Sequence, residues 1–335
     1  MTLLDPWGRP ITYLRISVTD RCNLRCVYCM PPEGVQRMEH QAIMRYEEIA
    51  EVVRVAAGEG IRRVRVTGGE PLVRLDLPVL IRMIHETPGI EDISLTTNGL
   101  QLERMARELR EAGLNRINIS LDTLQVEKFA RITRGGSLET VLRGIAAAEA
   151  VGLAPIKINA VAMRGVNDDE VLDLARLTLT HPWHMRFIEL MPVLNQETWG
   201  AGFPPPAEAF MSIAEIRAML EPFGLQPVAR AEQPSQRVMD GPAHEYVLPG
   251  AQGRIGFISP LSEHFCQECN RMRMTADGNF RPCLLKDEEV PFLRAMRAGE
   301  AVRPYLLKAV ESKPAGHALA ELQPPTRRCM QQIGG

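Results

Sequence analysis

Three cysteines within eight residues constrain this chain more than any other feature. Cys22, Cys26 and Cys29 follow the apolar run Ile11 to Val18 at a C-x3-C-x2-C spacing. Thiolates are soft ligands that select zinc, copper(I) or iron–sulfur clusters. If three thiols hold a four-iron cluster, one iron lacks a protein ligand, so the spacing favours a reactive centre open to a small molecule. A structural zinc site with a distant fourth ligand, or three unrelated core thiols, are the alternatives.

The composition limits the remaining function classes. A length of 335 residues suits one large α/β domain with an appendage, or two domains. The formal net charge of −2 argues against a nucleic-acid protein. We find neither an apolar stretch long enough to cross a membrane nor a signal peptide, so we expect a cytoplasmic protein with no membrane contact.

The seven cysteines fall into two groups with one left over. The second group is Cys266, Cys269 and Cys283, and Cys329 stands alone. An odd total in two clusters opposes a secreted disulfide framework and favours two metal sites. For the second site, structural zinc completed by His264, His317 or Cys329 is an alternative to an iron–sulfur cluster.

Short β-rich runs alternate with amphipathic helical runs from residue 11 to about residue 190. Such alternation predicts crossover units and a parallel sheet. Six strands are too few for a closed eight-stranded barrel, so an incomplete barrel and an open doubly wound sheet both fit. The predicted strands are Tyr13–Val18, Arg63–Thr67, Ile93–Thr97, Arg116–Leu121, Ile156–Ala162 and Met185–Leu190, and the predicted helices are Glu47–Ala57, Pro78–Glu86, Leu102–Ala112, Leu138–Val151 and Asp169–Thr180.

Polar residues at the strand ends favour the incomplete barrel, because chemistry in parallel α/β folds collects beyond the carboxyl ends of the strands. In chain order, the six strands end at or carry the cysteine loop, Thr67–Pro71, Thr96–Gly99, Ser120–Asp122, Lys157 with Asn159, and Arg186 with Glu189. Nearer the C-terminus we expect a helix from Ile213 to Phe223 capped by Ser212, and a hairpin that turns at Asp277-Gly278.

Two further motifs point to a bound anion or a closely approached ligand. Gly68-Gly69-Glu70 follows a strand, where glycines let the backbone come close to a ligand, although an ordinary tight turn explains them equally well. Arg271 and Arg273 alternate along a predicted strand, so both guanidinium groups lie on one face and suit a phosphate or carboxylate.

The first cysteine group, with Tyr28 just before its last member, resembles the signature of the radical S-adenosylmethionine (SAM) superfamily. In that superfamily SAM chelates the open iron, and an electron from the cluster cleaves it to methionine and a 5′-deoxyadenosyl radical. The resemblance implies SAM contacts from Tyr28, Gly69, Glu70, Ser120 and Met191. It also implies that residues 1–225 form an incomplete (β/α)6 barrel and that residues 226–335 carry the second cluster and bind substrate.

A wider set of motifs resembles the GTP 3′,8-cyclase family of molybdenum cofactor biosynthesis. These motifs are Leu14–Arg21, Arg65–Leu72, Leu95–Gly99, Ile119–Asp122, Arg186–Glu189, the second cysteine group and the final Gly334-Gly335. The family's activity implies conversion of GTP to a 3′,8-cyclised nucleotide. Its partners would be an electron donor and a downstream cyclic pyranopterin monophosphate synthase, and a homodimer is compatible with the pattern.

The family resemblance also implies a role for individual residues. Two [4Fe–4S] clusters would form, on Cys22, Cys26 and Cys29 for SAM and on Cys266, Cys269 and Cys283 for the guanine base. Gly334 and Gly335 would reach the active site. The GTP contacts would come from Arg15, Arg65, Thr96, Lys157, Arg271, Met272 and Arg273.

Two rival functions use the same cysteines. A peptide-modifying radical SAM enzyme with auxiliary clusters usually carries more C-terminal cysteines than this chain, which has only Cys329 to spare. An iron–sulfur electron carrier needs no pocket, which the glycine motif and the polar strand ends oppose.

Overall fold

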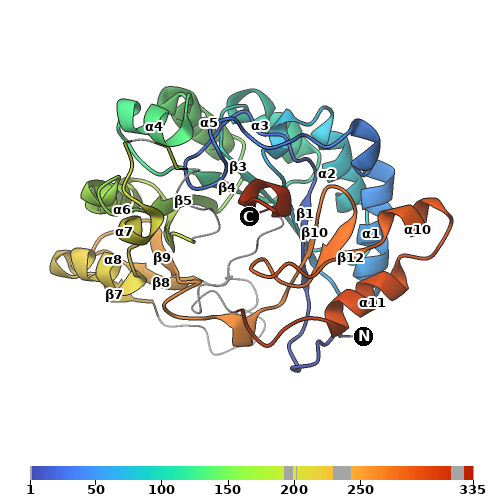
Figure 1. Ribbon diagram of the computed structural model, residues 1–335. Helices are drawn as coiled ribbons and strands as arrows, with labels where there is room; N and C mark the ends of the chain where they lie inside the picture. Colours follow the sequence, from blue (N-terminus) through green and yellow to red (C-terminus); the bar gives the residue numbers. More distant parts are fainter. Residues whose placement is uncertain (1, 192–198, 201, 229–242, 318–327, 335) are drawn as a thin grey trace.

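The computed structural model describes residues 2–191, 199–200, 202–228, 243–317 and 328–334. Six parallel strands form the centre of the sheet in chain order (Figure 1). They are β1 (Tyr13–Ser17), β2 (Arg63–Thr67), β3 (Asp92–Thr97), β4 (Arg116–Ser120), β5 (Ile156–Ala162) and β6 (His184–Glu189). The sequence prediction of these strands is confirmed, with bounds that differ by a residue at most at either end.

Strands from the C-terminal part extend both edges of this sheet. β10 (Arg271–Met274) pairs in parallel with β1, and β9 (Arg254–Ile258) pairs in parallel with β6. The outer strands, all antiparallel to their neighbours, are β7 (Gln226–Pro227), β8 (His244–Val247), β11 (Asn279–Arg281) and β12 (Val290–Pro291). The sheet order is β12-β11-β10-β1-β2-β3-β4-β5-β6-β9-β8-β7, which is not closed. The incomplete barrel is therefore confirmed, whereas a division at residue 225 stays a prediction.

Helices cover the outer face of the central strands. They are α1 (Tyr46–Gly58), α2 (Leu77–His85), α3 (Leu102–Glu111), α4 (Val126–Thr133), α5 (Leu138–Ala150) and α6 (Val171–Thr180). Among these six, only α4 was not predicted; it is only two turns long and lies in the same connection as the longer α5. Near the C-terminus lie α7 (Pro206–Ala209), α8 (Ile213–Leu220), α10 (Leu293–Arg297) and α11 (Arg303–Glu311).

Two local predictions about the C-terminal part are also confirmed. Ser212 caps α8 in a capping box, in which its hydroxyl accepts from the Glu215 backbone N–H and the Glu215 carboxylate accepts in return. The hairpin of β10 and β11 turns at Asp277-Gly278. The capping box and the hairpin turn each depend only on residues close together in the chain, which is why the sequence alone predicts them.

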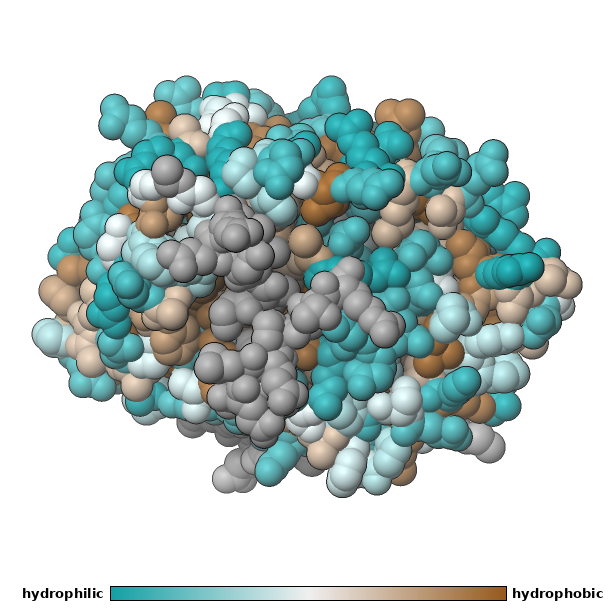
Figure 2. All heavy atoms as spheres, in the orientation of Figure 1, coloured by the Kyte–Doolittle hydropathy of each residue, from teal (hydrophilic) through white to brown (hydrophobic). Residues whose placement is uncertain are grey.

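The two faces of the central strands differ in polarity. Leu14 and Ile16 of β1 are fully buried in the apolar core, whereas Arg15 between them lies on the opposite face. The apolar core thus lies between the strands and the helices, and the inner face is left for polar side chains. On the outside, Figure 2 shows hydrophobic residues scattered among hydrophilic ones. No helix in the described ranges is long and apolar enough to cross a membrane.

Candidate active site

Positively charged side chains gather on the inner face of the sheet. In the strand register Arg15 of β1 lies opposite Arg65 of β2 on one side and opposite Arg273 of β10 on the other. Burial, followed by the charges of Arg273 and Arg65, holds the pKa of Arg15 well below its usual value. Burial and Arg271 likewise lower the pKa of Arg273 to about 9. Such crowding of like charges is unfavourable by itself and would be relieved by a bound anion.

The opposite side of the interior adds two more cations. Lys157 of β5 is only 7% exposed, and burial together with Arg186, Arg116 and Arg65 lowers its pKa to about 7. Burial and Arg65 lower the pKa of Arg186 to about 9. The charge of Arg65 lowers the pKa of both Lys157 and Arg186, so the cations of β2, β5 and β6 face one shared space.

Several buried polar atoms on this inner face have no hydrogen-bond partner among the described residues. They include Thr96 Oγ1, Asn159 Oδ1 and Arg186 Nε. Buried polar groups in folded proteins are nearly always satisfied, so orphaned ones call for an explanation. A polar, anionic ligand in the interior supplies one.

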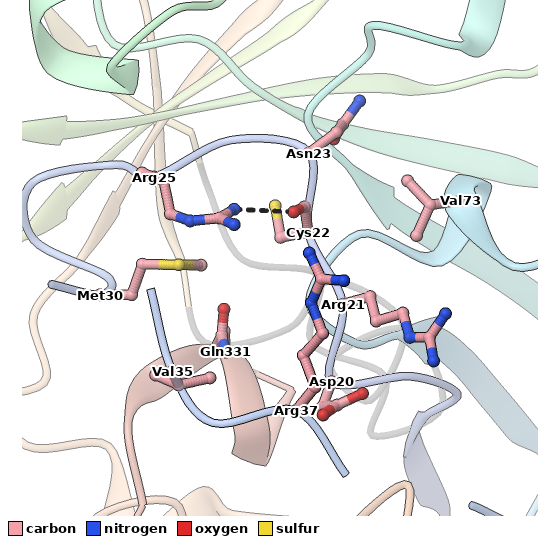
Figure 3. Close-up of a pocket in the computed structure, with 10 residues that line it drawn as sticks. All are labelled: Asp20, Arg21, Cys22, Asn23, Arg25, Met30, Val35, Arg37, Val73 and Gln331. Atoms are coloured by element: carbon pink, nitrogen blue, oxygen red, sulfur yellow. Dashed lines mark hydrogen bonds between the residues drawn. The ribbon is translucent and has the colours of Figure 1, made fainter. Parts of the chain in front are cut away.

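The first cysteine group lies in a loop held in place by arginines. Arg134 donates to the carbonyls of Arg25 and Met30, at 3.0 Å each, and so closes the loop from both sides. Arg25 donates to the carbonyl of Cys22 at 2.8 Å. A pocket of about 270 Å³ adjoins Cys22, with Arg21, Arg25, Arg37 and Gln331 among its lining residues (Figure 3).

The three thiols affect one another electrostatically. Burial, then Cys29 and Asp122, raise the pKa of Cys26 well above its usual value. Burial and Cys22 raise the pKa of Cys29 to about 12. Three half-buried thiols in one short loop are donors of the kind that an iron–sulfur centre takes, and the positive charge of such a centre would reverse these pKa shifts. This fit depends on donor chemistry, because in the described ranges no three His, Cys, Asp or Glu side chains are grouped as around a metal ion.

The glycine motif packs directly against the cysteine loop. The N–H of Gly69 donates to the Thr19 carbonyl at 2.8 Å, and a Cβ at Gly69 would lie 2.3 Å from the Arg21 carbonyl oxygen. Only glycine allows this approach of backbone to backbone. The motif therefore has a structural role in holding the loop, whatever ligand it also contacts.

Glu70 is buried and its carboxylate is already occupied by protein donors. It accepts from the backbone N–H groups of Leu72 and Asn98 and from the Thr97 hydroxyl, at 2.7 to 2.9 Å. Burial outweighs these bonds and raises the pKa of Glu70 to about 7. The carboxylate thus ties the ends of β2 and β3 together.

The other residues expected to contact SAM lie near strand ends. The Tyr28 hydroxyl donates to Asp122 at 2.8 Å, which holds the ring beside the end of β4, where Ser120 is the last residue. Met191 packs into a small apolar cluster that includes Cys283, Leu285 and Met330. It therefore lies near the second cysteine group and the C-terminal segment.

The second cysteine group surrounds the start of β10 and the end of the hairpin. Cys269 is close to two cations, since the Lys313 ammonium donates to its sulfur at 3.5 Å. Although burial opposes it, Arg271 and Lys313 lower the pKa of this thiol to about 6. Lys313 also donates to the carbonyls of Arg271 and Pro282, so it joins the two segments that carry Cys269 and Cys283.

The C-terminal segment lies on the inner face of the curved sheet, near β1 and β10, as Figure 1 shows. The Gly334 carbonyl accepts from Arg273 Nη1 at 2.9 Å, and a Cβ at Gly334 would lie 2.8 Å from the Thr67 methyl group. Gly334 also has a φ of +65°, a conformation that favours glycine. Gly335 lies outside the described residues.

The structure thus brings together most of the residues singled out from the sequence. Met272 differs, because it is fully buried in the apolar core on the face opposite to Arg271 and Arg273, which leaves only its backbone for a ligand. Sequence reasoning did not select Arg116, Arg186 or Lys313 as site residues. The alternation of Arg186 with apolar neighbours could have revealed it, whereas Lys313 lies outside any strand pattern.

Comparisons with known proteins agree with this geometry. Residues 16–178 match the Radical SAM superfamily model, and residues 183–319 match the Molybdenum Cofactor Synthesis C model. Proteins named GTP 3′,8-cyclase from Pelotomaculum thermopropionicum and Moorella thermoacetica are each 48% identical, over 99% of this chain and 99% of theirs.

Solved structures share the fold at low identity. Streptococcus suis SuiB gives a TM-score of 0.62 at 14% identity and covers 94% of this chain and 69% of its own. SuiB bound to S-adenosylmethionine gives 0.58 at 16% identity, and this chain spans only 61% of that one. The full-length similarity and the two family matches show that the chain belongs to the GTP 3′,8-cyclase family within the radical SAM superfamily.

Proposed function

We propose that this protein converts GTP to (8S)-3′,8-cyclo-7,8-dihydroguanosine 5′-triphosphate, which makes it a lyase. The observation that carries the proposal is the buried cationic interior between two cysteine groups. An iron–sulfur cluster on Cys22, Cys26 and Cys29 would supply the electron that cleaves SAM. The deoxyadenosyl radical would then take the hydrogen from ribose C3′, and C3′ would bond to C8 of guanine. The radical left on the base would have to gain one electron, from the electron donor, and one proton to give the 7,8-dihydro product.

The cations of the interior bind and orient the triphosphate in this proposal. Arg15, Arg65 and Arg273 approach it from β1, β2 and β10, with Arg271 at the start of β10. Lys157 approaches from β5, and Thr96 contributes a buried hydroxyl that has no hydrogen-bond partner in the described part of the chain. Guanidinium groups suit phosphate oxygens because their paired N–H donors match the spacing of the oxygens.

Contacts to SAM would come from residues in the first cysteine loop and near the ends of the strands beside it. The proposed residues are Tyr28, Gly69, Glu70, Ser120 and Met191. Since three donors occupy the Glu70 carboxylate, we assign Glu70 the role of fixing the backbone that faces SAM. Binding by backbone carbonyls and N–H groups then follows from the close approach that the glycines allow.

The second site and the partners are also part of the proposal. Cys266, Cys269 and Cys283 would hold a second [4Fe–4S] cluster that binds the guanine base. About eight iron atoms per chain after reconstitution support two clusters, and about four with zinc present would assign zinc to this site. The cytoplasmic location, the electron donor, the downstream synthase and a homodimer stay predictions.

Anaerobic incubation of the reconstituted protein with SAM, a reductant and single nucleoside triphosphates tests the proposal. Mass spectrometry should detect the cyclised product with GTP and not with ATP, CTP or UTP. Cys26→Ser protein is the matched control and should yield neither deoxyadenosine nor product. If wild-type protein cleaves SAM but leaves GTP unchanged, the assigned substrate is wrong.

A further inference from the structure

Arg328, just before the C-terminal segment, forms an ion-pair network with the β10–β11 hairpin. Its guanidinium donates to both carboxylate oxygens of Asp277, at 2.9 and 3.2 Å. It also contacts Glu289 through two nitrogens, each at 2.8 Å. Asp277 lies in the hairpin turn, so Arg328 connects the terminal segment to the tip of this hairpin.

The network is only partly exposed to water. The side chain of Arg328 is 14% exposed, and those of Asp277 and Glu289 are 25% and 17% exposed. Arg281, fully buried on β11, donates to the same Glu289 carboxylate at 2.8 Å. Two-pronged arginine–carboxylate pairs that are screened from water are stronger and more directional than isolated surface pairs.

The other end of the terminal segment is attached to the same hairpin. Arg273, on β10, donates to the Gly334 carbonyl. Between these two attachments, Gln331 is 4% exposed and Ile333 is 1% exposed. The segment is therefore fixed to the hairpin at Arg328, is buried at Gln331 and Ile333, and is fixed again at Gly334.

We propose that Arg328 is a positioning residue that docks the terminal segment, so that Gly334 lies in the cationic interior beside Arg273. This inference rests on the proposed function of the tail in cyclisation. Attachment at Arg328 keeps Gly334 at a high effective concentration near Arg273, as a short linker does for a second binding module. Within the described ranges, the hydrogen bonds and ion pairs of Arg328 go to Asp277 and Glu289, neither of which is assigned to substrate or SAM.

The test compares five reconstituted proteins: wild type, Arg328→Met, a deletion of Gly334 and Gly335, the combination of both changes, and the control variant Arg294→Met. Methionine keeps an unbranched stem but removes the charge and the donors. We expect Arg328→Met to lower kcat/KM for cyclisation roughly tenfold. SAM cleavage without nucleotide and the iron content should not change. Arg294→Met on α10 replaces an exposed arginine and should behave as wild type.

The double variant separates docking from a general effect on the hairpin. If Arg328 acts through the tail, its substitution should have no further effect once the two glycines are gone. If Arg328→Met lowers the activity of the truncated protein as much as that of the full chain, it acts elsewhere and the proposal is overturned.

Amide hydrogen exchange tests docking without using activity. Exchange at residues 331–334 should be roughly tenfold faster in Arg328→Met than in wild type or Arg294→Met. Unchanged exchange would overturn the docking role. If exchange rises but the glycine deletion leaves cyclisation intact, docking by Arg328 stands, and the proposed function of the tail fails instead.

Discussion

The buried ammonium of Lys157 should make nucleotide binding depend on pH. Burial and the nearby Arg186, Arg116 and Arg65 lower its pKa from 10.5 to about 7. A bound triphosphate would offset these positive charges and raise the pKa again. Above pH 7, binding would therefore take up a proton, and the affinity should fall as the pH rises.

The size of this pH effect on GTP affinity follows from the protonation of Lys157 in the ligand-free protein. At pH 8 only about a tenth of ligand-free molecules would carry the proton on Lys157, so the affinity should be about tenfold lower than at pH 6, or ~1.4 kcal/mol. Arg186 and Arg273, with pKa values of about 9, keep their charge over this range. At pH 6, Lys157→Met should weaken GTP binding by roughly 1.5–3 kcal/mol.

The lowered pKa of Lys157 also makes the stability of the ligand-free protein depend on pH. An unfolded lysine keeps a pKa near 10.5, so between pH 7 and 10.5 the unfolded chain binds more protons than the folded one. The cost of burying Lys157 in ligand-free protein is therefore full below pH 7 and shrinks as the pH rises.

Equilibrium binding of GTP to the SAM-loaded protein from pH 6 to 8 provides the assay. The nucleotide's own ionisation affects wild type and Lys157→Met alike, so the ratio of their affinities isolates the lysine. That ratio should fall about tenfold across the range. A ratio that stays constant with pH would refute the reasoning, and an equal loss of SAM affinity in the variant would make the lysine structural.

Three further predictions concern the cysteine sites. Cys26→Ser should abolish SAM cleavage, whereas Cys283→Ser should keep SAM cleavage in the absence of nucleotide and stop cyclisation. Assays of deoxyadenosine and of the cyclised product distinguish the two variants. Cyclisation that survives Cys283→Ser would show that the second cysteine group does not hold the substrate. Gly69→Ala should lose iron from the first site because its Cβ would meet backbone at 2.3 Å, whereas Gly58→Ala, with open space around it, should match wild type in iron content and melting temperature. Lys313→Met should shift the reduction potential of the second site to more negative values, since a cation that donates to a ligating sulfur is lost; an unchanged potential by redox titration would contradict this.

The parts of the fold and site that the sequence predicted are encoded by neighbouring residues. Most of the central strands are short runs in which apolar residues alternate with polar ones, and the first cysteine group is contained in a single loop. The alternation of Arg271 and Arg273 predicted that both lie on one face of their strand. Arg273 lies beside Arg15 on the inner face of the sheet, which agrees with this prediction. Period-two patterns and motif spacing need no knowledge of tertiary contacts.

The unpredicted parts depend on contacts between distant segments. Lys313 reaches Cys269 only because the chain after α11 returns to the start of β10, and no local pattern marks a lysine for that position. Arg328 similarly depends on where the hairpin turn lies. The three protein donors to the Glu70 carboxylate were not predicted either, because their convergence depends on how β2 and β3 are aligned.

The pairing of β1 with β10 has a consequence for the order of folding. The strand that leads into the first cysteine loop has β2 on one side and β10, from residue 271 onward, on the other. Contacts between segments so far apart in sequence form slowly, because a long loop must close before they can contribute. Until most of the chain has been synthesised, β1 therefore lacks one of its neighbours and the pocket beside Cys22 lacks Gln331. Iron delivered to a nascent chain would meet an incomplete site, so cluster insertion is expected to follow folding of the C-terminal part.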